Sequence, residues 1–366
     1  MSERPPVRAL ARGTVDQASP RRWSRRAVLR TALALGVAVP ASVAGVTVLR
    51  RREGVAPPPS ASPAPLSPSD ITPGRTPPPA RTATPTLTPT PSPSPTPTPA
   101  PPPPATFEFR PKDAGNGETT LLIVRATERR GQVRFLGQVF PLRQQGDLLW
   151  TLLGVPVEAE LGPRTVEITL QDADGKATQR VVATTTVVAV ERPVDYLEVT
   201  EAVQSLLTPQ AGITEEQLRA KEFSAFDSAV RWEKPFIQPA AGPVSTQFGS
   251  GRSVNGGPVG GFHSGADIAN DHGTPVVAAA PARVAYVEGH PIRGLSVILD
   301  HGAGVKSGYH HLEAALVKPD DAVEAGTLIG RMGTSGYSTG PHLHWEVTVY
   351  GVNVDPFTWT KETFRP

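Results

Sequence analysis

Apolar and polar residues alternate with a period of two in the segment 342–349, which predicts a β-strand with one face packed into a core. The polar face should be the wetter one, and two imidazoles two residues apart on it should lie about 7 Å from each other. The apolar face comprises Leu343, Trp345, Val347 and Val349, and the polar face comprises His342, His344, Glu346 and Thr348.

Several shorter β-type runs, rich in β-branched and aromatic residues and separated by Gly, Asp and Pro turns, occupy residues 106–190. This spacing predicts a small immunoglobulin-like β-sandwich. The region contains no His and no Cys, so we expect a spacer or binding module rather than a second catalytic domain. The predicted strands are 120–126, 132–140, 148–153, 165–171 and 180–190.

A connector over residues 191–237 has helical patterns near 195–207 and 214–230. Thr214 is the expected N-cap of the second helix, with Gln217 as its capping-box partner. Further on, 297–299 reads as a buried strand that ends in a turn over 300–302.

The N-terminal segment 1–55 has the pattern of an export signal, because arginines precede an uncharged, largely apolar run over 31–49. Residues 24–30 resemble a bacterial twin-arginine signal. The run has 19 residues, which is also enough to cross a bilayer as an uncleaved anchor. We therefore expect export, with cleavage and membrane anchoring both open.

Proline defines the next segment, since 21 of the 42 prolines fall within residues 56–105. A chain of this composition cannot bury a core, and proline blocks both helix and sheet ladders. We expect a disordered, extended linker that reaches up to ~155 Å at ~3.1 Å per residue. Its role would be to hold a working domain away from a membrane.

Charge is distributed unevenly along the chain. Residues 1–55 carry a net charge of +8, so the other 311 residues have a net charge of −6 in a chain whose total is +2. A nucleic-acid-binding domain would carry positive charge on its fold, so no nucleic-acid partner is expected. The chain has no cysteine, which excludes disulfides, thiolate metal ligands and a catalytic thiol.

Histidine is confined to one window, with all eight copies between His263 and His344. His263 and Asp267 are four residues apart, and an imidazole and a carboxylate that converge on one point suit zinc. On its own this spacing is common, and an exposed His near an unrelated Asp is the more frequent case. Of the adjacent pair His310 and His311, one can face a groove only if the other faces away.

Taken together, these motifs resemble lysostaphin/LytM-type zinc metallopeptidases that cut peptidoglycan cross-links. The resemblance covers about residues 238–358 and implies a mainly β chain whose C-terminal domain is built on an antiparallel sheet. The immunoglobulin-like sandwich and the Pro-rich linker would precede this domain. The residues that carry the resemblance are His263-x-x-x-Asp267, Tyr309-x-His311-Leu312 and His342-x-His344, with the glycine-containing segments around them.

The resemblance implies a role for each matching residue. His263, Asp267 and His344 would bind Zn²⁺, and His311 and His342 would form the catalytic pair. Three protein ligands leave the fourth tetrahedral position open, as in catalytic zinc sites. His310 falls at a variable position, and no metal role is implied for the remaining histidines, which are His272, His290 and His301.

The resulting hypothesis is a zinc endopeptidase that acts on peptidoglycan in the cell wall or from the outer face of the plasma membrane. The alternative is a module of the same fold that binds the wall or activates an amidase without hydrolysis. A carrier domain with a swinging lysine is disfavoured, because the sequence has no lysine between Lys318 and Lys361. The bond cut and the oligomeric state stay open.

Overall fold

A computed structural model describes residues 103–223 and 225–366 of the chain. The predicted export signal and nearly all of the predicted Pro-rich linker lie outside these residues. Within the described part, no helix is long and apolar enough to cross a membrane.

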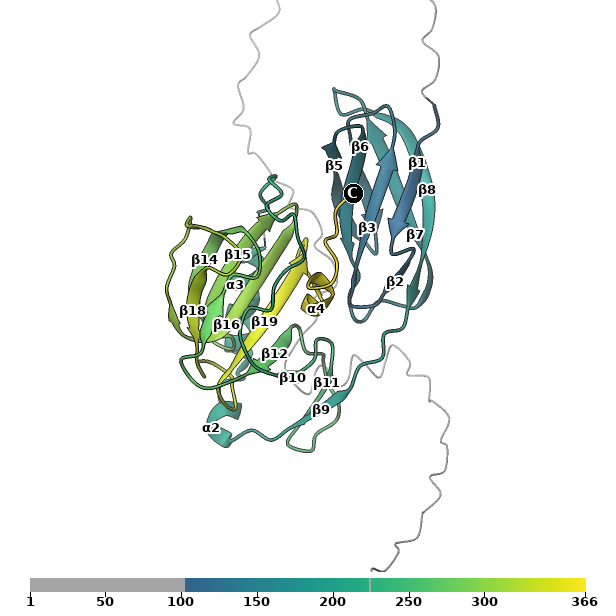
Figure 1. The fold of residues 1–366 in the computed structure, drawn as a ribbon. Helices are drawn as coiled ribbons and strands as arrows, with labels where there is room; N and C mark the ends of the chain where they lie inside the picture. The colour runs from purple at the N-terminus through teal and green to yellow at the C-terminus, as the bar shows by residue number, and fades with distance from the viewer. Residues whose placement is uncertain (1–102, 224) are drawn as a thin grey trace, which may run out of the picture. The chain divides into compact units, whose positions relative to one another are not determined.

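The described chain is mainly β, as the sequence predicts, and its strands form two large sheets (Figure 1). The first sheet is built from the N-terminal half of the described residues. Its strands are β1 (Thr106–Arg110), β2 (Asp113–Gly115), β3 (Thr119–Arg125), β4 (Arg130–Phe135), β5 (Gln138–Gln145), β6 (Leu148–Gly154), β7 (Gly162–Gln171) and β8 (Ala177–Val188).

The order of strands in this first sheet is β1-β3-β6-β5-β4-β7-β8-β2, and only the β2–β8 pair is parallel. The single strand predicted over 132–140 is wrong, because β4 and β5 are two strands joined by a tight turn. Leu136 and Gly137 form the turn with φ angles of 46° and 81°. Leucine seldom adopts a positive φ, so the sequence carried no recognisable turn signal there.

The second sheet lies in the C-terminal half and includes the segment whose alternation was most regular. Its strands are β10 (Val244–Thr246), β12 (Ala266–Ala269), β13 (Pro275–Val277), β14 (Ala282–His290), β15 (Gly294–Gly302), β16 (Val305–Ala315), β17 (Ala322–Val323), β18 (Leu328–Met332), β19 (His342–Val349) and β20 (Val352–Val354).

In this second sheet β19 is an interior strand, paired with β12 on one side and β16 on the other. The order along the main path is β10-β12-β19-β16-β15-β14-β17. The predicted turn over 300–302 is wrong, since β15 continues through Gly302. The chain reverses instead at Ala303 and Gly304, whose φ angles are 51° and 82°.

The strand predicted over 342–349 is confirmed as β19, and all four residues of its apolar face are fully buried. The predicted wetter polar face is found only at its first residue, since His342 is the one residue of β19 that is not buried. Glu346 and Thr348 are each only 1% exposed, and His344 is 6% exposed. Another part of the chain must therefore cover this face.

The connector departs from its predicted helices. Residues 194–197 form β9 (Val194–Leu197), which pairs in parallel with β11 (Gly251–Val254). A short helix, α2 (Glu201–Gln204), follows, and the long helix is α3 (Pro209–Glu222). The N-cap of α3 is Thr208 rather than the predicted Thr214, because Pro209 can occupy the first helical turn and the Thr208 side chain accepts a hydrogen bond from the Ala211 amide.

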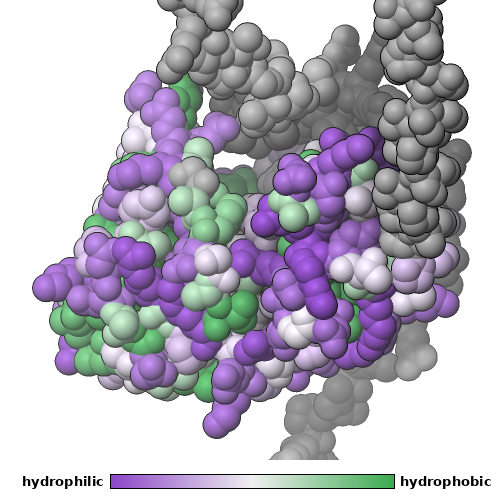
Figure 2. All heavy atoms as spheres, turned by 90° about the horizontal axis from the view of Figure 1, so that it is seen from above, coloured by the Kyte–Doolittle hydropathy of each residue, from purple (hydrophilic) through white to green (hydrophobic). Residues whose placement is uncertain are grey.

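Two apolar cores hold the described chain together. One lies within the first sheet and includes Phe140, Val166 and Leu170. The other centres on the second sheet, includes Tyr309 and Trp345, and extends to α4 (Pro356–Trp359). On the face drawn in Figure 2, hydrophilic and hydrophobic residues of the described chain are interspersed rather than gathered into one patch.

Candidate functional site

Strand pairing brings the predicted site residues together from distant parts of the sequence. Asp267 on β12 lies opposite His344 on β19, and His342 lies two residues earlier on β19. His311 comes from β16, on the other side of β19, and His263 from the loop that precedes β12. The antiparallel sheet thus positions four of the five side chains, and the loop before β12 brings His263 to them.

His263, Asp267 and His344 form a compact donor group, and each of them is buried. The Nε2 atom of His263 lies 2.8 Å from Nδ1 of His344 and 3.0 Å from Oδ1 of Asp267, while His344 Nδ1 lies 2.8 Å from the same oxygen. Ligands of a tetrahedral zinc at 2.0–2.2 Å would be roughly 3.3 Å apart. The group therefore needs only a slight widening to hold this ion.

In each of the two imidazoles, the ring nitrogen that points away from the donor group also has a hydrogen-bond partner. His263 Nδ1 lies 3.0 Å from the carbonyl oxygen of Gln247, and His344 Nε2 lies 3.0 Å from Oε1 of Glu346. Such partners fix the tautomer and the ring orientation of metal-binding histidines. This feature of the donor set supports the fit to a zinc ion.

The protonation states of the donor group are those that bind a cation. Burial lowers the pKa of His263 to about 4, despite the adjacent Asp267 carboxylate, so this ring is neutral near pH 7. Burial alone would raise the pKa of Asp267, but the adjacent imidazoles of His263 and His344 hold it well below its ordinary value. Neutral imidazole and ionised carboxylate are the forms that bind metals.

His344 differs from His263, because it lies between two carboxylates. Burial lowers its pKa, but the hydrogen bonds to Asp267 and Glu346 outweigh this effect and raise it overall. A cation bound at Nδ1 would take the place of the proton on that atom. The remaining proton would then be on Nε2, where it can be donated to Glu346.

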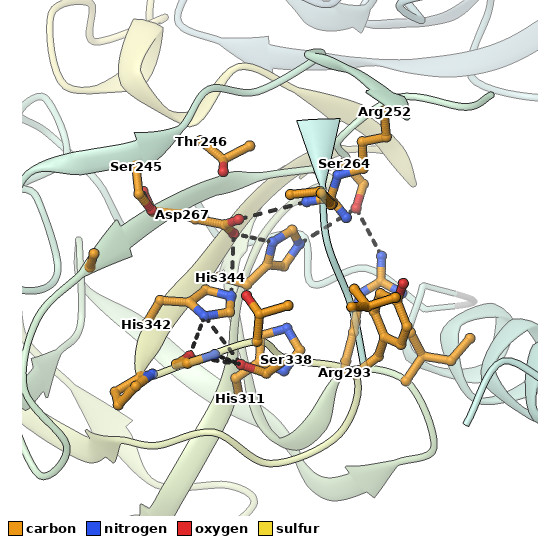
Figure 3. A pocket seen from close by; sticks show the side chains of 18 residues that line it. Ser245, Thr246, Arg252, Ser264, Asp267, Arg293, His311, Ser338, His342 and His344 are labelled. Carbon is orange, nitrogen blue, oxygen red and sulfur yellow. Dashed lines mark hydrogen bonds and ion pairs between the residues drawn. The ribbon is translucent and has the colours of Figure 1, made fainter. Parts of the chain in front are cut away.

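A pocket of about 440 Å³ opens beside this group (Figure 3). Asp267, His311, His342 and His344 line it, and in Figure 3 their side chains point toward one another. His263 is not among the lining residues. Other lining residues include Arg252 on β11, Arg293, Tyr337, Ser338 and the connector residues Leu197 and Val199.

His311 and His342 have the same hydrogen-bonding arrangement. Nδ1 of His311 lies 2.7 Å from the carbonyl oxygen of Ser335, and Nδ1 of His342 lies 2.8 Å from that of Gly340. Each Nδ1 therefore carries the proton and donates it, which leaves Nε2 as an acceptor. His342 Nε2 is 3.7 Å from Asp267 Oδ1, so it lies next to the donor group.

Burial lowers the pKa of both rings, and for His311 the neighbouring His342 and His344 add to the effect. Both are therefore neutral proton acceptors near pH 7. His311 also has a φ angle of 59°, an unusual conformation for a residue other than glycine. Such strained backbone positions occur often at functional sites.

The other histidines lie outside the lining of this pocket. His301 is buried, with Nδ1 2.9 Å from the Pro281 carbonyl oxygen and Nε2 2.7 Å from the Ser307 hydroxyl. His310 is also buried and has Nδ1 2.8 Å from the Ser296 hydroxyl. His272 is largely exposed and pairs with Glu313.

Sequence reasoning missed two contributors to this site. Glu346 was assigned to the polar face of β19 without a role, although its position two residues after His344 is the signal that could have suggested one. Arg252 Nη2 lies 3.6 Å from Asp267 Oδ2, and the side chain lines the pocket. No spacing in the sequence links Arg252 to the histidine motifs.

Comparison with known proteins matches the same region of the chain that contains the candidate site. The profile of peptidase family M23 matches residues 261–356. The chain is 39% identical over 93 residues, 25% of its length, to the peptidoglycan DD-endopeptidase ShyB of Vibrio cholerae. It is 33% identical over 153 residues, 41% of its length, to the murein hydrolase activator NlpD of Salmonella dublin.

These relatives are matched only in part, since the chain covers 22% of ShyB and 36% of NlpD. Among solved structures, a Pseudomonas aeruginosa protein assigned to peptidase M23 matches 66% of this chain and 92% of its own, with 24% identity and a TM-score of 0.49. The family match includes every one of the five predicted site residues. Residues 261–356 of this chain therefore form a domain of peptidase family M23.

Proposed function

We propose that the C-terminal domain, residues 238–358, is a zinc-dependent endopeptidase that hydrolyses peptide cross-links of bacterial peptidoglycan. The observation that carries the proposal is the meeting of a three-donor group with two further imidazoles at one pocket. Three protein ligands are typical of catalytic zinc sites, whereas structural sites use four. The DD-endopeptidase among the relatives supports peptidoglycan as the substrate.

In this proposal His263 Nε2, Asp267 Oδ1 and His344 Nδ1 would hold the ion. Bound zinc would polarise the scissile carbonyl and make water acidic enough to act as a nucleophile near neutral pH. The chain's own residues supply the proton transfers and the orientation of the substrate. The Nε2 atoms of His311 and His342 are the available proton acceptors at the pocket.

We assign the role of general base to His342, because its Nε2 atom lies beside the donor group, at 3.7 Å from Asp267 Oδ1. A neutral His311 cannot donate from Nε2, so it would have to gain a proton before it could stabilise an oxyanion or protonate the leaving amine. The two rings are neighbours, with centroids 4.7 Å apart, so His342 is the adjacent source of that proton.

A second candidate function is activation of another wall hydrolase without turnover, which the likeness to the murein hydrolase activator NlpD favours. An activator needs the fold and a docking surface but no proton acceptors beside a metal group. The complete set of donor and acceptor residues at the pocket favours the hydrolytic proposal.

The deciding experiment is incubation of the full chain with cross-linked muropeptides of defined structure, followed by mass spectrometry of the products. We expect cleavage of a peptide bond that a chelator abolishes and zinc restores. His344→Ala should lose bound zinc and activity together, since it removes a ligand. His272→Ala, an exposed histidine outside the pocket lining, is the matched control and should retain both.

Two results would contradict the proposal of a zinc-dependent hydrolase. Intact muropeptides after incubation with the zinc-loaded chain, combined with stimulation of a separate amidase, would support the activator function instead. Cleavage that survives both chelation and His344→Ala would remove the metal from the reaction.

We further propose that the chain is exported and acts outside the cytoplasm, with residues 1–55 as the signal or anchor and residues 56–105 as a spacer. Support comes from the sequence pattern of these segments and from relatives named for action on peptidoglycan or murein. Replacing Arg25 and Arg26 by lysine should retain the protein in the cytoplasm, as cell fractionation can measure. Unchanged export would exclude the twin-arginine route.

A further inference from the structure

The carboxylate of Glu346 lies directly behind the metal-donor group. It comes from the polar face of β19, is 1% exposed, and its Oε1 atom is 3.0 Å from His344 Nε2. A metal at His344 Nδ1 requires the ring proton to be on Nε2, so Glu346 accepts that proton's hydrogen bond. Its position thus decides how firmly His344 is held as a ligand.

A fully buried carboxylate is costly unless cations and hydrogen-bond donors surround it. Arg219 and Arg293 supply the positive charge that compensates Glu346. Arg293 Nη2 is 2.6 Å from Oε1, and Arg219 Nη1 is 2.8 Å from Oε2. The Ser264 hydroxyl donates to Oε1 at 2.6 Å.

Two of the groups that build this arrangement belong to α3 rather than to the M23 domain. Arg219 is one of them. The other is Glu215, whose Oε1 lies 2.8 Å from Arg293 Nη1 and whose Oε2 accepts from the Ile292 amide at 3.1 Å. The helix ends at Glu222, well before residue 261 where the family match begins.

These contacts form a chain of alternating charges that begins and ends on α3. Glu346 pairs with Arg219 on α3, and one helical turn away Glu215 on α3 pairs with Arg293, which returns to Glu346. All four side chains are less than one-fifth exposed, so solvent does little to screen them. Loss of one member would leave its partner as a buried, uncompensated charge. That partner would then shift and displace the side chain it contacts.

We propose that helix α3 is part of the metal site, with Arg219 and Glu215 as positioning residues that act on His344 through Glu346. This inference rests on the proposed zinc site at His263, Asp267 and His344. The unit that binds zinc tightly therefore begins before residue 209 rather than at the start of the M23 domain. Neither α3 residue touches the donor atoms, so both act at a distance from the ion.

The test measures zinc affinity of the full chain by competition with a chromophoric chelator. Arg219→Gln and Glu215→Gln should each weaken zinc binding by up to about 10-fold, the lower end of the cost of losing a direct partner of a metal ligand, because both act through Glu346. Glu216→Gln, an exposed neighbour on the same helix, is the matched control and should bind zinc as the unaltered chain does. Arg219→Lys keeps the positive charge and should recover part of the affinity.

Two further readouts separate positioning from general stability. The visible spectrum of the Co²⁺-loaded protein should change in Arg219→Gln, because the ligand geometry at His344 changes, and should not change in Glu216→Gln. In the unaltered protein, zinc should slow hydrogen exchange of the α3 backbone amides. The exchange measurement needs no variant and stays decisive if Arg219→Gln fails to fold.

The inference is overturned if the folded α3 variants bind zinc within twofold of the unaltered chain, or if zinc leaves hydrogen exchange in α3 unchanged. Either result would leave the proposed peptidase function intact. Conversely, an unaltered chain that binds zinc and loses affinity in the α3 variants, yet leaves muropeptides intact, supports the inference and contradicts the proposed function.

Discussion

Both faces of β19 are largely buried, but for different reasons. Its apolar face packs into a core that the second sheet shares with α4 and with strands β3 and β6 of the first sheet, and Trp345 and Val347 are fully buried there. Its polar face is covered by charged side chains, which include Arg219 on α3 and Arg293 in the turn between β14 and β15. Alternation along a strand identifies which residues share a face, but it does not tell whether the polar face meets water or a buried ionic network.

The largest effect should be on the rate of hydrolysis and should come from His342, the first residue of the polar face of β19. His342→Ala should lower the rate of muropeptide hydrolysis by about 10²- to 10⁴-fold, the usual contribution of a general base. Zinc content should stay unchanged, because His342 is not in the donor group. Steady-state kinetics and metal analysis measure the two quantities, with His272→Ala as control. Loss of zinc together with activity would assign His342 to the ligands instead.

The apolar face should matter for stability rather than for the metal. Trp345→Ala should reduce the free energy of unfolding by about 3–5 kcal/mol, because it leaves a large cavity in a fully buried position. Denaturant unfolding measures the change. Tyr196→Ala, which removes an aromatic ring that is 77% exposed, is the control and should have little effect. A loss below about 1 kcal/mol for Trp345→Ala would contradict the packing described for this face.

The ionic network behind the polar face should make stability depend on pH through His290. This ring lies 3.5 Å from Glu215 and 2.6 Å from Glu222, both on α3. Burial alone would lower its pKa, but the two glutamates raise it from 6.5 to about 9. The stability that His290 contributes is therefore fully present below pH 6.5 and is lost as the pH rises through 9.

Thermal unfolding between pH 6 and pH 10 checks this expectation. The unaltered chain should lose roughly 2–6 °C more in Tm over this range than His290→Asn, which has no ring to titrate. Identical pH profiles would show that the ring is not held in its charged form.

The smallest effect should come from Thr348. Its hydroxyl is buried and has no hydrogen-bond partner among the described residues. Thr348→Val keeps the shape and removes the unsatisfied group, so the free energy of unfolding should rise by up to about 1 kcal/mol. The same change at the exposed Thr184 should be neutral. Clear destabilisation by Thr348→Val would mean that this hydroxyl has a partner in the folded protein.

Much of the site could be predicted from the sequence, since the resemblance to a known family named all five residues that the structure brings to one group and one pocket. Their roles stay predictions until zinc and turnover are measured. The strand at 342–349 was predictable because every second residue is apolar. The β4–β5 turn was not, since Leu136 has a positive φ that its residue type disfavours.

The least predictable part of the structure was the burial of the polar face of β19 by charged residues of α3. Glu215, Arg219 and Glu222 share one side of α3, and a charged stripe on a helix usually indicates a solvent-exposed surface. Arg219 is also 127 residues from Glu346, so no local pattern links them. The charges could be recognised as buried only once the fold had brought complementary groups to both sides.

The most direct test of this account is anomalous diffraction at the zinc absorption edge from crystals of the zinc-loaded chain. The account predicts one strong peak about 2.0–2.2 Å from His263 Nε2, Asp267 Oδ1 and His344 Nδ1. A peak elsewhere in the molecule, with these three atoms making no bond to metal, would contradict it.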